Sequence, residues 1–163
     1  MRFGSDRDIS LMVNIGRELL HDIIEQEILY HKISLEDTDV NLYGESLSKS
    51  YWNAVKLNCL ITRGDQIVDI QEFGPDLGRE ASFAFIREDM VDSNIVAEVG
   101  DIIQWHTDFY EVDTVRENQL FVGRDSGYNL SSYANNFGSS VSIIVDCHLT
   151  RADKVGISKV VSR

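Results

Sequence analysis

Three short apolar segments follow one another at residues 102–105, 109–115 and 119–122, and their spacing constrains the fold more than any other feature. Connections this short join antiparallel neighbours, because parallel strands need a crossover of about a dozen residues or more. Residues 107–108 and 116–118 supply the expected turns. The region therefore predicts an antiparallel meander.

Apolar and polar residues also alternate from residue 51 to residue 62, which is typical of a strand with one buried face. Residues 63–65 are expected to form a turn, after which residues 66–70 return as the paired strand. Residues 73–78, which contain the only proline, are expected to form a loop. Further strands are predicted at residues 28–33, 81–86 and 141–149.

An amphipathic helix is predicted before the strands, over about residues 8–25, with Asp8 as its N-cap. Its polar residues are expected to face solvent. The apolar stripe packs either against its own domain or against a neighbouring subunit, and the pattern leaves both open. The stripe comprises Met12, Ile15, Leu19, Leu20, Ile23 and Ile24, and the polar face comprises Asn14, Arg17, Glu18, His21, Asp22 and Glu25.

Together these elements predict a mostly β protein, an antiparallel β-barrel or sandwich with one N-terminal helix. We expect a single domain over residues 1–163, with strands at about residues 27–149 and a C-terminal tail at residues 150–163 that runs out to solvent or to a partner. Closure into a barrel or sandwich would remove exposed strand edges. No apolar stretch approaches the roughly 20 residues that cross a bilayer, and the N-terminus lacks the apolar core of a signal peptide. Synthesis in the cytoplasm is therefore expected.

The charge argues against sequence-specific DNA binding. Twenty-seven acidic residues against fifteen basic ones leave a net charge of −12, whereas proteins that read nucleic acid normally present a basic face. An acidic wall would instead repel DNA and let it slide past. The two cysteines, Cys59 and Cys147, lie in apolar runs and are expected to be reduced core thiols.

The strongest metal candidate is His106 with Asp108, joined by Cys147 and His148. His106 and Asp108 fall in a predicted hairpin turn, however, where exposed polar residues are expected in any case. Cys147 and His148 would face opposite sides of a strand. No nucleophile elbow or phosphate loop is present. We therefore predict no enzymatic activity, no cofactor and no metal site.

Two tyrosines are candidates for subunit contact. Tyr128 and Tyr133 lie in a polar, glycine-containing segment at residues 123–140, where aromatic side chains are not easily buried within one chain. Tyrosine is enriched at the anchor points of protein interfaces. The acidic pairs Glu36–Asp37 and Glu88–Asp89 are expected to lie in solvent-exposed turns.

One sequence order points to a known family. The helix leads into Glu-Ile-Leu-Tyr-His at residues 27–31, and Glu-Val-Gly-Asp-Ile-Ile-Gln-Trp at residues 98–105 precedes Phe-Tyr-Glu-Val at residues 109–112. Gly100 permits a sharp turn, and Asp101 is able to bond turn amides. Over about residues 9–130 the chain resembles the neck, or head-completion, proteins of T4-like contractile-tailed bacteriophages. It is shorter than those proteins and lacks their long acidic C-terminal extension.

The resemblance implies a structural virion protein with no catalytic residues to transfer. Copies would form a homo-oligomeric ring, of six subunits, that closes the DNA-filled head after assembly in the host cytoplasm. Loops or the helix would reach a portal or adaptor protein above and a tail terminator below, and DNA would pass through without specific binding. The candidates for an acidic channel wall are Glu36, Asp37, Asp39, Glu88 and Asp89.

Three alternatives remain open at this point. The first is that the chain forms another ring of the head–tail connector or tail, such as a tail terminator or adaptor, although a terminator usually mixes helices across its sheet and an adaptor is mainly helical. The second is that the chain is a small metal-dependent hydrolase that uses His106, Asp108 and His148. The third is that the chain is a regulatory binding module.

Overall fold

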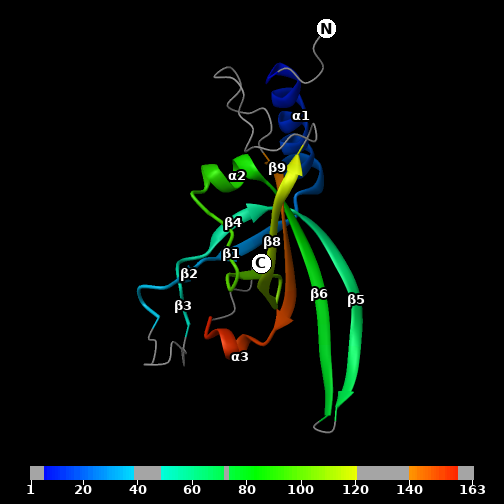
Figure 1. Cartoon of the computed structure of the whole chain (residues 1–163), viewed down its shortest axis with the longest axis vertical. Coiled ribbons are helices and arrows are strands. Elements are labelled where there is room, and N and C mark those ends of the chain that lie inside the picture. Colours follow the sequence, from blue (N-terminus) through cyan, green and yellow to red (C-terminus); the bar gives the residue numbers. More distant parts are fainter. Residues whose placement is uncertain (1–5, 39–48, 72–73, 121–139, 158–163) are drawn as a thin grey trace.

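A computed structural model describes residues 6–38, 49–71, 74–120 and 140–157. These residues form one seven-stranded antiparallel sheet, a second sheet of two short strands, and a helix at the N-terminal end (Figure 1). The predicted mostly β architecture with an N-terminal helix is confirmed. Within the described ranges, no helix is long and apolar enough to cross a membrane.

The strands of the large sheet are, in spatial order, β4 (Val55–Asn58), β1 (Glu27–His31), β7 (Ile102–Trp105), β8 (Asp108–Leu120), β9 (Ser140–Thr150), β6 (Gly74–Ile86) and β5 (Leu60–Gln71). The small sheet pairs β2 (Ile33–Ser34) with β3 (Ser50–Tyr51). The helical elements are α1 (Asp6–Glu18), the π-helical segment η1 (Leu19–Ile24), α2 (Arg87–Asp92) and α3 (Ala152–Val155).

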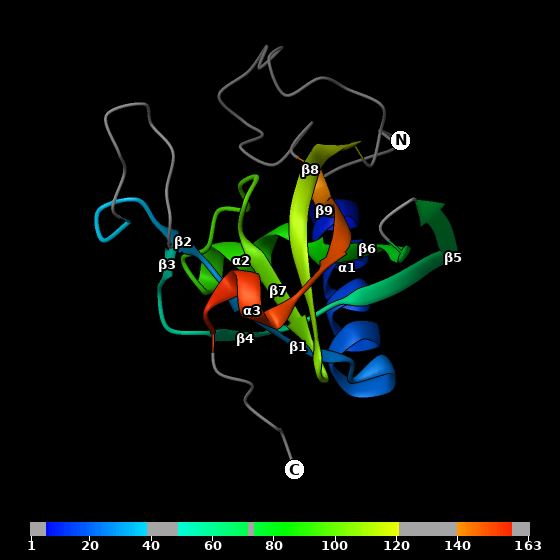
Figure 2. The same cartoon turned by 90° about the horizontal axis from the view of Figure 1, so that it is seen from below.

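The large sheet curls back on itself without closing. Its two outermost strands, β4 and β5, are consecutive in the chain and are separated only by Cys59. The two ends of the sheet therefore approach each other at this fully buried cysteine, where the chain runs from β4 directly into β5 (Figure 2). Because the strand order is open, the sheet is not a closed barrel.

The β5–β6 pair corrects the prediction for residues 63–78. The chain does not turn at residues 63–65, because a register shift between Arg63 and Gln66 accommodates one extra residue and lets β5 continue. Its partner is β6, which includes residues 74–78 of the predicted loop. A similar irregularity lets β8 run through the turn predicted at residues 116–118.

Part of this pair projects beyond the sheet. β9 pairs with β6 over Glu80–Ile86, so among the described strands residues 66–71 and 74–79 pair with each other and with no third strand. They form a two-stranded ribbon that extends away from the body of the protein (Figure 1).

The core lies on the inner side of the curled sheet and is rich in aromatic rings. Phe83 and Tyr110 are packed edge to face with ring centroids 5.5 Å apart, and Tyr30 meets Phe85 in the same manner. Cys59 and Cys147 are free and buried in this core, as predicted. Burial raises the pKa of the Cys59 thiol to about 12, so this thiol stays protonated at neutral pH.

The described part of the predicted C-terminal tail, residues 150–157, packs onto the sheet and does not run out to solvent or to a partner. Residues 152–155 form α3, and Val155 is buried against Ile102 and Phe109. Gly156 ends the helix in the left-handed conformation that glycine adopts most readily. The N-cap prediction is also wrong, because Asp8 lies inside α1 rather than at its start.

The turn that leads into β7 is built as the sequence predicts. Gly100 has a φ of +93°, and the Asp101 carboxylate accepts the Glu98 backbone N–H at 2.9 Å. The same buried carboxylate accepts the Tyr30 hydroxyl at 2.7 Å and the Ile33 backbone N–H at 3.0 Å. Lys32 Nζ lies 3.2 Å away as the counter-charge. Asp101 therefore ties the β1–β2 junction to the start of β7.

Candidate assembly interface

The N-terminal helix packs on the sheet through a different stripe from the one predicted. Val13 and Leu20 are buried against Ile86, with Ile24 and Val141 at the margin of this small cluster. Gly16 also faces Ile86, since a Cβ at this position would lie 3.4 Å from the Ile86 side chain. Of the six apolar residues predicted to pack, only Leu20 and Ile24 do so within the described part of the chain.

Five other apolar residues of the helix face solvent. Leu19 is 45% exposed and Ile23 is 74% exposed, and the others lie between these values. We call this surface the apolar stripe, and its residues are Leu11, Met12, Ile15, Leu19 and Ile23. Isolated exposed leucines are ordinary, but several in a row along one helix mark a surface that something else covers.

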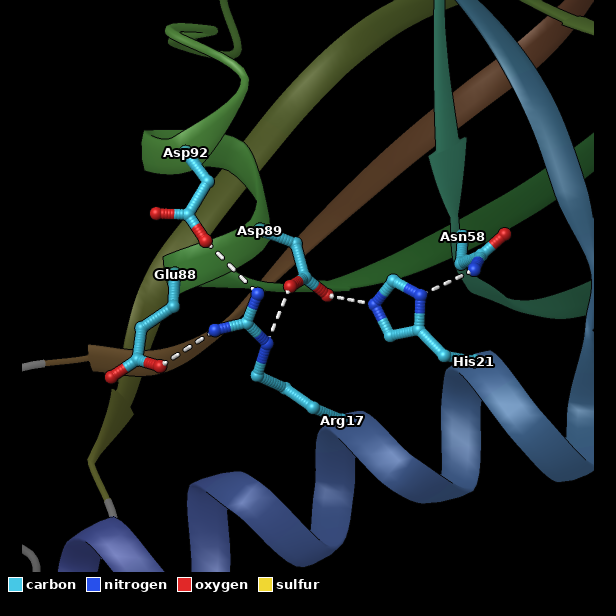
Figure 3. A network of polar contacts seen from close by, with 6 residues as sticks. All are labelled: Arg17, His21, Asn58, Glu88, Asp89 and Asp92. Atoms are coloured by element: carbon cyan, nitrogen blue, oxygen red, sulfur yellow. Dashed lines mark hydrogen bonds and ion pairs between the residues drawn. The ribbon is translucent and has the colours of Figure 1, made fainter.

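A network of charges fixes the opposite side of the helix to α2 (Figure 3). Arg17 makes ion pairs with Asp89 at 2.8 Å, Asp92 at 2.9 Å and Glu88 at 3.4 Å. Partial burial alone would lower the pKa of Arg17, but the attraction of Asp89, Asp92 and Glu88 outweighs it and leaves the pKa raised. Arg17 is therefore the cationic centre of the helix attachment.

His21 extends the network towards β4. Its Nε2 lies 3.0 Å from the Asp89 carboxylate, and its Nδ1 accepts the Asn58 side-chain amide at 2.7 Å. This arrangement corresponds to the tautomer that carries its proton on Nε2. Three elements, α1–η1, α2 and β4, thus meet at one imidazole ring.

Asp89 corrects the sequence expectation most directly. It was expected in an exposed turn and as part of a channel wall, but it is buried between Arg17 and His21. A buried carboxylate needs a cation and hydrogen-bond donors, which this side of the helix supplies. Arg17 and His21 of the face predicted to be wet therefore attach the helix to α2, whereas Asn14, Glu18, Asp22 and Glu25 are exposed as predicted. The helix is turned with its apolar stripe outward.

The first prediction concerns this attachment. Replacing Arg17 with methionine is expected to lower the free energy of unfolding by about 2 kcal/mol, because it leaves the buried Asp89 charge without its main partner. The matched control is Asp92→Asn, which removes an exposed member of the same network and should cost less than about 0.5 kcal/mol. Urea denaturation followed by fluorescence measures both.

A double variant separates lost charge balance from lost packing. Arg17→Met with Asp89→Asn removes both charges, so it should be more stable than Arg17→Met alone. If the double variant is instead less stable than Arg17→Met by the full cost of Asp89→Asn, the two residues do not act as a pair.

The other predicted acidic residues lie on two separate elements. Glu36 and Asp37 are exposed in the bend after β2, where the Asp37 carboxylate accepts the Ser34 hydroxyl at 2.9 Å. Glu88 is exposed on α2 beside Arg17. Asp39 and both candidate interface tyrosines, Tyr128 and Tyr133, lie outside the described residues.

The described residues do not assemble the metal candidates into a site. His106 is exposed in the β7–β8 turn with a φ of +52°, and Asp108 pairs with Arg79 at 3.5 Å. His148 bonds the Asp113 carboxylate at 2.8 Å on the exposed side of β9, whereas Cys147 is buried. Within the described ranges, no three His, Cys, Asp or Glu side chains are grouped so that they could hold a metal ion.

Two open grooves flank the helix attachment. The larger has a volume of about 790 Å³ and the smaller about 260 Å³, and both share Lys56, which pairs with Glu27 at 2.7 Å. The larger groove is lined by His21, Glu25, Gln26, Glu27, Ile28, Leu29, Lys56, Asn58, Gln104 and His106. Their charges of both signs indicate hydrated surface beside the attachment.

Sequence reasoning missed the attachment because its members are far apart in the chain. His21 and Asp89 are separated by 68 positions. The only local signal is the spacing of Arg17 and His21, which puts both on one side of a helix. Comparison with known proteins adds no further constraint, since the chain matches no protein-family profile and no curated protein sequence.

Proposed function

We propose that this chain is a non-catalytic structural subunit of the neck of a T4-like tailed bacteriophage. Copies form a ring that closes the DNA-filled head and joins it to the tail. The observation that carries the proposal is the apolar stripe of α1–η1, which lies open to solvent from Leu11 to Ile23. A chain that works alone gains nothing from such a surface, whereas an assembly subunit buries it.

The resemblance in the β7–β8 region supplies the particular kind of assembly. The Gly100–Asp101 turn and the hairpin of β7 and β8 form the most telling stretch of a likeness to phage neck proteins that covers about residues 9–130. A closed ring needs two different surfaces that complement each other on neighbouring copies. The β5–β6 ribbon is one such surface, because a two-stranded ribbon is only marginally stable by itself and gains stability against a neighbour.

The charge suits a passage for DNA. With a net charge of −12, the inner wall of a ring would repel phosphates and leave DNA free to move. Glu36, Asp37 and Glu88 remain candidates for that wall because they are exposed. Asp89 is withdrawn from the set because its carboxylate is buried. A portal or adaptor above and a tail terminator below complete the proposed neighbours.

Antibody labelling of intact particles tests the proposed position. Antibodies raised against the whole chain should decorate the junction between head and tail, and the chain should be present in about six copies in each purified particle. Labelling along the tail would assign the chain to a tail ring instead. Absence of the chain from purified particles would remove the proposal.

A further inference from the structure

We infer that the apolar stripe is the docking site for an amphipathic helix of a different protein, one that carries lysine or arginine along one border of its apolar face. The inference rests on the proposed function, because it names the partner chemistry of the assembly subunit. Three features of α1–η1 support it: the continuity of the stripe, the charge at its border, and the fixed orientation of the helix.

The stripe is continuous along the helix. Leu11, Ile15, Leu19 and Ile23 recur at intervals of four residues. In an α-helix of 3.6 residues per turn this spacing drifts steadily around the axis. The π-helical segment at Leu19–Ile24, which ends with the Glu25 N–H bonded to the Leu20 carbonyl, makes a wider turn that reduces the drift. The stripe thus offers one apolar ridge of the kind that packs into a groove of a second helix.

The border of the stripe is acidic. Glu18 and Asp22 adjoin the ridge and are exposed, and Glu25 follows at the end of the helix. The basic side chains do not balance them, because Arg17 points to α2, and Arg7 lies at the opposite end of the helix, in its first turn. In helix pairing, the charges that border the apolar contact select the partner. A partner with basic residues at this border is attracted, and one with acidic residues is repelled.

A second copy of this chain fits the stripe poorly. It brings the same acidic border and a net charge of −12, so like charges would meet at close range. The helix is also not free to turn its other side outward, because Arg17 and His21 hold it to Asp89. The ring contact between copies therefore belongs to another surface, and the stripe belongs to a basic helix from a neighbouring protein.

Two synthetic peptides of opposite charge test this inference on the full-length chain. Both are about 18 residues long and share the same apolar helical face. One carries lysine at all positions outside that face, and the other carries glutamate there. Fluorescence anisotropy should show the lysine peptide binding at least about tenfold more tightly than the glutamate peptide. The preference should shrink when salt rises from about 50 to about 200 mM, and in Glu18→Gln/Asp22→Asn.

Variants locate the binding on the helix. Ile15→Gln/Leu19→Gln should weaken lysine-peptide binding by about tenfold or more, because both side chains lie in the ridge. The matched control is Leu35→Gln, which alters a side chain that is 74% exposed in the bend after β2 and should leave binding unchanged. Circular dichroism should show that all variants stay folded.

Several results would overturn the inference. They are equal binding of the two peptides, binding by neither, and unchanged binding by Ile15→Gln/Leu19→Gln. A fourth is a dimer of the free chain in sedimentation that this double variant dissociates, since the stripe would then bind a second copy. None of these depends on a phage role, so particle labelling and peptide binding fail independently.

Discussion

Replacing Asp101 with alanine is expected to lower the free energy of unfolding by about 3–5 kcal/mol, the largest loss from any single polar side chain described above. The side chain is fully buried. Its removal leaves the Tyr30 hydroxyl and the backbone N–H groups of Ile33 and Glu98 without their acceptor. It also strips Lys32 of one of its two carboxylate partners.

The reason for so large an effect is that each of these donors loses water on folding. An unpaired buried donor costs about 1–3 kcal/mol, and relaxation or entry of water recovers only part of the sum. The Tyr30 hydroxyl is the donor that depends most on Asp101. Burial and the adjacent Asp101 charge raise the Tyr30 pKa and hold the hydroxyl in its neutral, donating form. The loss would consume much of the stability of a typical domain, which is about 5–15 kcal/mol.

Urea denaturation of Asp101→Ala and Asp101→Asn measures this effect. The control is Asp113→Ala, which removes an exposed carboxylate paired only with His148 in the described contacts and should cost less than about 0.5 kcal/mol. Asp101→Asn keeps an acceptor oxygen and should fall between the two. A loss in Asp101→Ala no greater than in the control would mean that the turn before β7 does not depend on this residue.

The second large effect concerns assembly rather than folding. In a phage that lacks its own copy of the gene, Ile15→Gln/Leu19→Gln should fail to restore infectious particles, while the purified variant unfolds at the same urea concentration as the unaltered chain. Both side chains are exposed in the free protein, so folding loses nothing. In the proposed assembly they would be buried, and removing two such side chains weakens a contact by about a hundredfold or more.

A substitution on the buried side of the same helix is expected to lower the stability of the isolated chain. Leu20→Gln places an amide in the buried cluster with Val13 and Ile86, so it should destabilise the isolated chain by about 2 kcal/mol or more. Plaque titres and urea midpoints together distinguish the two classes of variant. Restoration of full titre by Ile15→Gln/Leu19→Gln would show that the stripe has no role in the particle.

Local patterns in the sequence predicted the parts of the fold that local physics determines. Alternation at Leu57 and Cys59 indicated a buried face, and both residues are buried. The single strand predicted from residue 51 to residue 62 is wrong, however, because the chain forms β3, β4 and β5 there and passes from one edge of the sheet to the other at Cys59. The short spacing between residues 105 and 109 predicted the β7–β8 hairpin, which forms. Gly100 and Asp101 were correctly interpreted as a turn because their conformational freedom and hydrogen-bonding capacity act within a few residues.

The orientation of the helix could not be predicted in this way. Two apolar stripes compete on it, one through Val13 and Leu20 and one through Ile15 and Leu19, and both have helical spacing. The choice depends on the carboxylates of α2, which reach Arg17 and His21 only in the folded chain. The prediction of a turn at residues 63–65 was wrong for a related reason. A bulge at residues 63–66 lets β5 continue where Gly64 suggested a turn.

Electron microscopy of lysates from a phage that lacks this gene tests the central claim most directly. The account predicts DNA-filled heads that leak their DNA and complete tails that remain unattached, with normal joined particles restored by the intact gene. Joined particles in normal numbers without the gene would contradict the account, since heads would then be closed and joined to tails in the absence of this protein.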